Sequence, residues 1–166
     1  IFMPVAHANL PMVVFDHHIT NTQYGTINVV EPGMASTCEV IYRLLNRLGI
    51  SLSSDIANAL LTGIITDTLA FRTSNTTPDT LATAMECMRA GASLTEITRR
   101  ALVTRPFESL KLLGAGLNAA HLDGRIIYAT ITRKLRKEIS NREERGDGGL
   151  VGQLITANEA DIAVVF

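Results

Sequence analysis

The spacing of apolar residues along the chain alternates between two periods, which together predict a mixed α/β protein. Short apolar or alternating runs, typical of strands, occupy residues 12–15, 26–30, 126–131 and 161–166. Apolar residues three or four positions apart, typical of one helix face, recur in residues 36–48, 53–66, 77–90, 93–101, 106–117, 133–140 and 150–155. No regular element is predicted for residues 1–11, a turn is predicted for 122–125, and a solvated loop for the charged, glycine-rich residues 141–149.

The start of the first predicted helix has two interpretations. Ser36 or Thr37 can cap its free N–H groups, and Glu39, three residues after Ser36, would complete a capping box. Free N–H groups and hydroxyls at a helix N-terminus also bind phosphate well. Capping is the favoured interpretation, and phosphate binding stays open.

Composition and charge exclude several classes of protein. Of the 166 residues, 46% are hydrophobic, which allows a buried core and argues against a disordered segment. The formal net charge is −1, so the chain lacks the basic footprint of a non-specific nucleic-acid binder. A short phosphorylated substrate held by metal is compatible with this charge.

Cysteine usage and the lack of long apolar runs point to the cytoplasm. Cys38 and Cys87 fall within predicted helices and have no zinc-ligand spacing, which argues against a structural zinc site and a disulfide framework. No apolar run is long enough to span a bilayer, and no signal peptide is visible. Because Ile1 is not a methionine and Phe166 ends a predicted strand, we expect the chain to be a fragment of a longer protein.

The candidate chemistry begins where the first predicted strand ends. Asp16, His17 and His18 follow residues 12–15, and open α/β sheets bind ligands at the carboxyl ends of their strands. Imidazole suits Mn²⁺, Zn²⁺ or Fe²⁺, and carboxylates suit Mg²⁺ and Mn²⁺. Asp16 could fix a histidine tautomer by accepting its second N–H. The alternative is that the triplet is a polar loop after a core strand.

A second acid follows a strongly apolar helix. Asp67 comes directly after the apolar face of residues 56–65. A buried carboxylate is costly unless it is paired or bound to metal. The alternative is a solvated helix end at which Asp67 caps the segment that follows.

Together these motifs resemble the DHH phosphoesterase family. The first is residues 16–18, and the second is residues 63–68, with fifty residues from His17 to Asp67. Between them, residues 25–39 resemble the intervening family segment. The combination is much more specific than the tripeptide alone.

The resemblance also implies a branch and a domain arrangement. Residues 71–77 resemble the branch that includes bacterial nanoRNases, and residues 126–131 and 149–151 resemble the start of a second domain, DHHA1. The implied fold is a parallel-sheet DHH domain, represented by its C-terminal half, followed by a helical connector and a smaller α/β domain. The expected parts are a partial DHH domain at 1–104, a helical linker at 105–120 and the start of the substrate-binding DHHA1 domain at 121–166.

A two-metal site is implied by the same resemblance. In this family two Mn²⁺ ions are held by acids and histidines from four motifs. His17 and Asp67 are the implied metal ligands in this chain. His18 is implied to face the substrate phosphate, with Asp16 supporting the histidines.

Other implied features lie around this site or outside the chain. Ser36 and Arg72 are implied as phosphate contacts. The remaining metal motifs are expected before Ile1 and the glycine-rich substrate clamp after Phe166, so the segment alone is expected to be inactive. Ala70 stands where this branch commonly carries glycine, which is expected to change the loop slightly.

The leading hypothesis is a Mn²⁺-dependent phosphoesterase that hydrolyses short oligoribonucleotides and 3′-phosphoadenosine 5′-phosphate (pAp). The alternatives are a cyclic-di-AMP or pApA phosphodiesterase, a non-catalytic nucleotide-binding module and a plain α/β structural domain. A manganese pyrophosphatase is less favoured, because residues 71–77 resemble the nanoRNase branch. Short oligonucleotides or mononucleotide phosphates are the expected partners, without long duplex nucleic acid or membrane. A homodimer is one of the oligomeric states left open.

Overall fold

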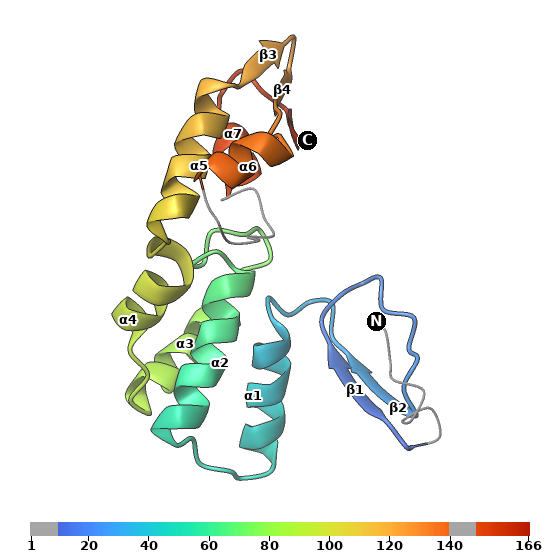
Figure 1. Ribbon diagram of the computed structural model, residues 1–166. Helices are drawn as coiled ribbons and strands as arrows, with labels where there is room; N and C mark the ends of the chain where they lie inside the picture. The colour runs from blue at the N-terminus through green and yellow to red at the C-terminus, as the bar shows by residue number, and fades with distance from the viewer. Residues whose placement is uncertain (1–9, 140–148) are drawn as a thin grey trace. The chain divides into compact units, whose positions relative to one another are not determined.

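The computed structural model describes residues 10–139 and 149–166, and the chain divides into two compact units, Ile1–Thr104 and Arg105–Phe166 (Figure 1). The expectation for residues 1–11 therefore falls almost wholly outside the described residues, as does the loop expected at 141–149. Each unit has its own hydrophobic core.

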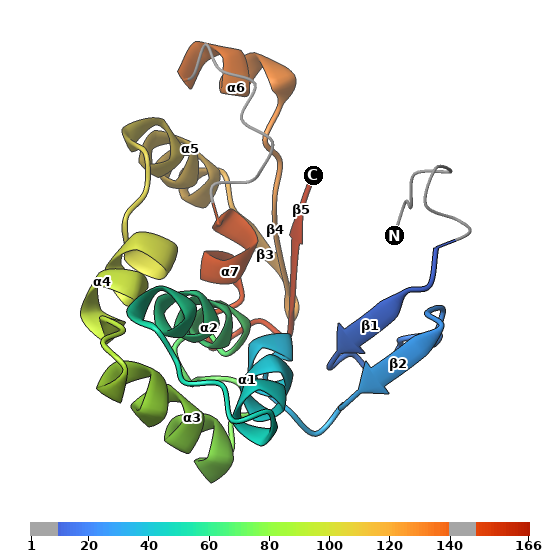
Figure 2. The same cartoon turned by 90° about the horizontal axis from the view of Figure 1, so that it is seen from below.

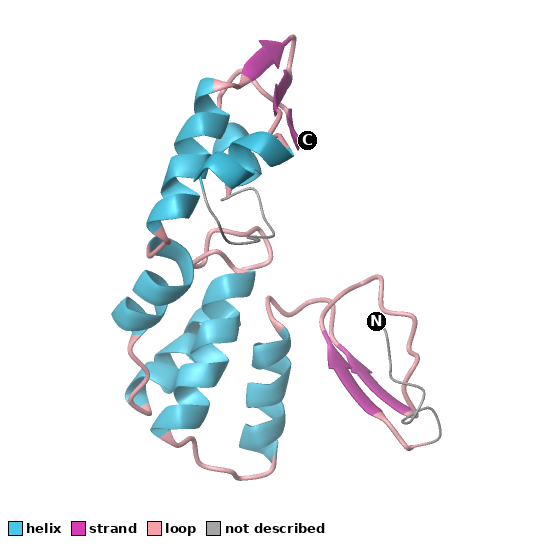
Figure 3. Ribbon diagram, viewed as in Figure 1, coloured by secondary structure: helices cyan, strands magenta, loops and turns pink. Residues whose placement is uncertain are grey.

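The first unit joins a pair of parallel strands to a group of helices (Figure 3). Its elements are β1 (Val13–Asp16), β2 (Ile27–Val30), α1 (Thr37–Arg47), α2 (Ser54–Asp67), α3 (Pro78–Arg89), α4 (Leu94–Thr98) and a π-helical turn, η2 (Arg99–Val103). Val13 pairs with Ile27 and Asp16 with Val30, so both strands end at the same edge. The polar residues after β1 therefore emerge beside the end of β2.

Helices α1, α2, α3 and α4 surround the core of the first unit. Its buried residues are Ala57, Leu60, Leu61, Ile65, Ala84, Cys87, Ala92 and Ile97. α1 and α2 approach closely at Gly63, where an added Cβ would lie 2.2 Å from Sγ and 3.1 Å from Cβ of Cys38. Burial raises the pKa of the Cys38 thiol, so the group that packs against Gly63 is neutral.

Capping residues begin the helices largely where the sequence predicts. The Ser36 hydroxyl accepts a hydrogen bond from the Cys38 N–H at the start of α1, and Thr77 and Thr80 form a capping box on α3. The capping box predicted for Ser36 and Glu39 is wrong: the Ser36 hydroxyl caps the Cys38 N–H, and the Glu39 N–H is bonded to the Ser36 backbone carbonyl. The Glu39 carboxylate accepts from the Ala35 N–H instead, because its side chain turns into the interior toward Thr80.

The second unit is a small sheet covered by helices (Figure 2). Its elements are α5 (Phe107–Asn118), β3 (His121–Asp123), β4 (Ile126–Ala129), α6 (Arg133–Ile139), α7 (Leu150–Leu154) and β5 (Ile162–Val165). The strand order is β3-β4-β5, with β3 antiparallel and β5 parallel to β4. Its core contains the buried residues Leu112, Ala129, Ile131, Leu150 and Leu154.

The turn expected at residues 122–125 is shorter than predicted. Leu122 and Asp123 belong to β3, and Gly124 turns the chain with a φ of 57°. A three-residue strand is too short to show an alternating pattern, which is why the sequence did not reveal it.

The predicted α/β class is confirmed by these two units. Within residues 10–139 and 149–166, no helix is both long enough and apolar enough to cross a bilayer.

Candidate metal centre

Asp16 ends β1 and organises the residues that follow it. Its Oδ1 accepts from the His17 N–H at 2.7 Å, the His18 N–H at 3.1 Å and the His18 Nδ1 at 2.7 Å. Its Oδ2 accepts from the Asn21 amide at 2.5 Å. The Asn21 side chain, followed by the His18 side chain, holds the pKa of Asp16 well below its usual range. Asp16 therefore orients its neighbours as an ionised carboxylate whose oxygens are already occupied.

His17 points its two ring nitrogens at different partners. The side chain is 13% exposed, and Nδ1 lies 3.3 Å from the Met34 carbonyl oxygen. Because a carbonyl can only accept, Nδ1 must carry the proton in this contact. In the neutral ring the lone pair is then on Nε2, which lies 3.7 Å from Oδ2 of Asp67.

Asp67 is the last residue of α2, and its side chain lies beside His17. Its side chain is 40% exposed, and the preceding turn of α2 packs on α1 through Gly63. The structure therefore brings His17 and Asp67 together from elements fifty residues apart. Their roles as metal ligands stay predictions.

The donor set and spacing of His17 and Asp67 fit a divalent cation. A neutral imidazole nitrogen and a carboxylate oxygen suit Mn²⁺, Fe²⁺ or Zn²⁺. Their separation of 3.7 Å is less than twice a metal–ligand bond of about 2.1 Å, so one ion can contact both atoms. Asp16, His17 and His18 also offer ligand atoms within 4.8 Å of one another. In that second group, however, the Asp16 carboxylate and the His18 Nδ1 are already hydrogen-bonded to each other.

His18 faces outward beside His17. Its side chain is 66% exposed, and the two rings lie 4.4 Å apart between centroids. Since Nδ1 donates to Asp16, Nε2 is the nitrogen left for an incoming group. His18 also borders a hollow of ≈ 570 Å³, which is further lined by Met12, Asp16, Thr20, Asn21, Thr22 and Tyr24.

Ser36 and Arg72, the other predicted site residues, have different surroundings. Ser36 is fully buried, and its hydroxyl caps α1. Arg72 is exposed, and its Nε donates to the Leu69 carbonyl at 2.8 Å. The phosphate contacts implied for these two residues stay predictions.

The loop after Asp67 adopts an unusual backbone. Leu69, Ala70 and Phe71 have φ values of 48°, 59° and 64°, in the left-handed region that disfavours side chains. Thr68 stabilises this loop: its buried hydroxyl donates to the Ile64 carbonyl and accepts from the Phe71 N–H. Sequence reasoning gave Thr68 no role, although it stands inside the second motif.

Replacing Ala70 by glycine should raise the free energy of unfolding slightly. Relief of the left-handed strain is worth about 1–2 kcal/mol, partly offset by about 0.4–1 kcal/mol of added freedom in the unfolded chain. Urea denaturation measures the difference. Ala82→Gly, on the exposed face of α3, is the matched control and should lower stability by about 1 kcal/mol. Equal losses in both variants would contradict the strain at Ala70.

Comparisons with known proteins agree with this architecture. The family model described as "DHH family, N-terminal domain" matches residues 3–64. The "Bifunctional oligoribonuclease and PAP phosphatase NrnA" of Thermus thermophilus is 37% identical over 157 residues, covering 93% of this chain and 46% of the relative. The chain belongs to the DHH family. The predicted resemblance is thereby confirmed.

More distant proteins also resemble this DHH chain. A "Probable manganese-dependent inorganic pyrophosphatase" of Streptococcus agalactiae is 24% identical over 149 residues, covering 78% of this chain and 47% of the relative. The crystal structure of an exopolyphosphatase-related protein from Bacteroides fragilis superposes with a TM-score of 0.82 at 22% identity. It covers 89% of this chain and 44% of that protein, and it supports the fold alone. The DHH chain spans about half the length of the curated relatives it matches.

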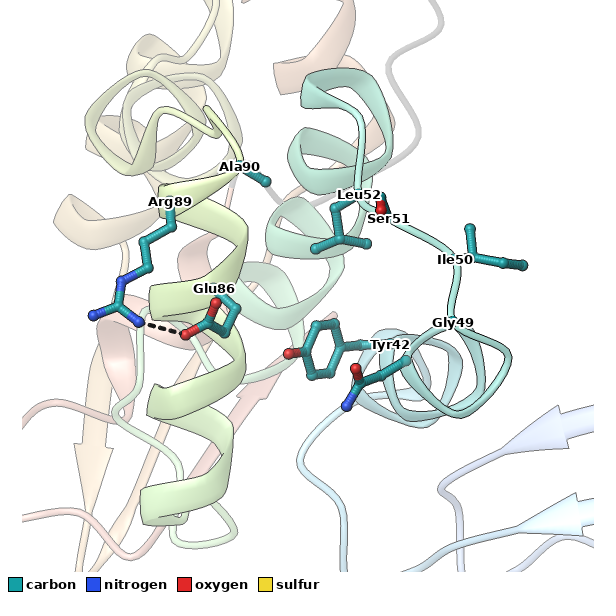
Figure 4. A pocket seen from close by; sticks show the side chains of 9 residues that line it. Tyr42, Gly49, Ile50, Ser51, Leu52, Glu86, Arg89 and Ala90 are labelled. Atoms are coloured by element: carbon teal, nitrogen blue, oxygen red, sulfur yellow. Dashed lines mark hydrogen bonds and ion pairs between the residues drawn. The ribbon is translucent and has the colours of Figure 1, made fainter.

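A second hollow of the DHH chain lies at the C-terminal end of α1 (Figure 4). His17 instead contacts Met34, which precedes the N-terminus of that helix. It has a volume of ≈ 470 Å³, and Tyr42 projects into it beside α3. Its two charged residues, Glu86 and Arg89, form an ion pair with each other at 2.7 Å. Their charges therefore cancel and offer no specific attraction for a charged ligand.

Proposed function

We propose that the protein carrying this DHH chain is a Mn²⁺-dependent phosphoesterase that hydrolyses short oligoribonucleotides and pAp. The observation that carries the proposal is the approach of His17 Nε2 to Asp67 Oδ2 at 3.7 Å. The proposal also draws on the similarity to NrnA, which extends over 93% of this chain.

In this proposal His17 and Asp67 contribute to holding two Mn²⁺ ions. Bound there, such ions would supply positive charge that stabilises a phosphoryl group and would lower the pKa of a coordinated water. His18, held by Asp16, faces the substrate phosphate and can donate to it from Nε2 when that nitrogen also carries a proton. The hydroxyl groups of Thr20 and Thr22 border the same hollow and suit the phosphate and ribose of a nucleotide.

The domain assignment belongs to the same proposal. Residues 1–104 are assigned to the DHH domain, residues 105–120 to a linker and residues 121–166 to the start of the DHHA1 domain. We place the activity in the cytoplasm, where short products of RNA degradation arise.

A direct assay separates this proposal from its alternatives. The full-length protein with Mn²⁺ should release phosphate from pAp and mononucleotides from a diribonucleotide, and His18→Ala should lose most of both activities. Cyclic-di-AMP and inorganic pyrophosphate are tested in parallel. Preferred turnover of either would reassign the substrate, and Mn²⁺ binding without hydrolysis of any of the four would support a non-catalytic nucleotide-binding module.

A further inference from the structure

A single peptide group lies between a buried carboxylate and His17. The C=O of Met34 and the N–H of Ala35 belong to the same planar unit. The N–H donates to Oε2 of Glu39 at 3.2 Å, and the C=O accepts from Nδ1 of His17 at 3.3 Å. Glu39 is thus connected to His17 through one peptide group.

We infer that Glu39 is a positioning residue for the metal ligand His17 and acts through the Met34–Ala35 peptide. This inference rests on the proposed function, in which His17 binds a metal ion. A ligating histidine usually donates its second N–H to a carboxylate or a carbonyl, which fixes its tautomer and increases its basicity. Here the Met34 carbonyl accepts this N–H directly, and the Glu39 carboxylate acts on that carbonyl through the peptide group.

The surroundings of Glu39 hold its carboxylate in place. The side chain is 1% exposed, and Oε2 also accepts from the Thr80 hydroxyl at 3.1 Å. Nη2 of Arg43 lies 3.4 Å from Oε1 and 3.2 Å from Asp79. A buried charge persists only when it is paired and hydrogen-bonded, and these contacts meet that requirement.

The charge of Glu39 should strengthen the contact made by His17. A carboxylate at the N–H end of a peptide draws its proton and increases the negative charge on the carbonyl oxygen. Met34 and Ala35 are both buried, so water competes weakly for this peptide. The polarised carbonyl accepts more strongly from Nδ1–H, which in the neutral ring leaves Nε2, 3.7 Å from Oδ2 of Asp67, free to bind a cation.

A purely structural role for Glu39 is the competing explanation. Its bond to Thr80 joins α1 to the start of α3, a link that could account for the burial of the carboxylate. The two explanations differ at His17. A structural link predicts lower stability alone, whereas a positioning role predicts a changed imidazole.

The test compares Glu39→Gln with Thr80→Val in the full-length protein. Long-range ¹⁵N–¹H NMR of the metal-free protein shows which ring nitrogen of His17 carries the proton. Wild type and Thr80→Val should carry it on Nδ1, with similar ring ¹⁵N shifts. Glu39→Gln keeps the side-chain shape but removes the charge, so it should move the proton or shift the ring resonances and lower Mn²⁺ affinity about tenfold.

Several results would overturn the inference. Protonation of wild-type His17 on Nε2 alone would overturn it. This result needs no variant, so the inference can be tested even if Glu39→Gln fails to fold. His17 shifts and Mn²⁺ affinity unchanged in Glu39→Gln, with only a lower Tm, would establish the structural role. Absence of Mn²⁺ binding in wild type would reject the proposed function, while the NMR comparison would still decide whether Glu39 positions His17.

Discussion

Replacing His17 or Asp67 by alanine should lower the Mn²⁺ affinity of the full-length protein by about 100-fold or more. Replacing a residue that merely orients a metal ligand typically lowers metal affinity by about 10–100-fold, so replacing a direct ligand should lower it at least as much. The two side chains approach to 3.7 Å, so each substitution should remove a donor from the same site. Isothermal titration calorimetry with Mn²⁺ measures the loss.

Two matched controls replace an acid and a histidine that are not among the candidate ligands. Asp55→Ala removes an exposed acid from the first turn of α2, at the other end of the helix from Asp67. His121→Ala removes an exposed histidine from β3 in the second unit. Both should leave Mn²⁺ affinity within about twofold of wild type, since Asp55 lies in the first turn of α2 and His121 belongs to the other unit of the chain. Wild-type affinity in His17→Ala and Asp67→Ala would favour the interpretation of the triplet as a solvated loop.

Replacing Gly63 by alanine should lower the free energy of unfolding by about 1–3 kcal/mol, the usual cost of overpacking. The new Cβ would lie 2.2 Å from Sγ of Cys38, and rotation of that thiol cannot relieve the 3.1 Å contact with its Cβ. Helices α1 and α2 must therefore separate. Because Asp67 follows one turn later, Mn²⁺ affinity should fall together with stability, as measured by urea denaturation and calorimetry.

Gly114 provides the control for the Gly63 substitution. It also lies within a helix, α5, but an added Cβ there meets no atom within 4 Å. Gly114→Ala should therefore raise stability by about 0.5–1 kcal/mol through helix propensity alone. Adding Cys38→Ala to Gly63→Ala should restore part of the lost stability, because it removes the nearest clashing atom. Equal gains in Gly63→Ala and Gly114→Ala would show that the helices tolerate the methyl group.

Local features of the sequence were sufficient to predict most of the fold. The periodicity of α1, α2 and α3 and their capping residues act over a few positions, so their starts are readable without knowledge of tertiary contacts. β3 was missed because it is three residues long, and the π-helical turn η2 has no pattern distinct from the end of α4.

Tertiary partners within the candidate site were harder to predict. The approach of Asp67 to His17 was expected from the family resemblance and not from periodicity. The contact of Glu39 with Thr80 spans 41 positions, and a local capping rule assigned Glu39 to a different partner. Every residue type has a main-chain carbonyl, so no side-chain pattern could indicate that the carbonyl of Met34 contacts His17.

The contact between His17 and main chain has a consequence for how selection would act on this region. Any side chain at position 34 supplies the same carbonyl, so Met34 should be replaceable during evolution by other apolar residues that preserve the local backbone. Position 35, which is fully buried, should accept only small residues. A conservation profile across homologues would then rank position 34 low despite its direct contact with the imidazole, and would place the constraint on Glu39 instead.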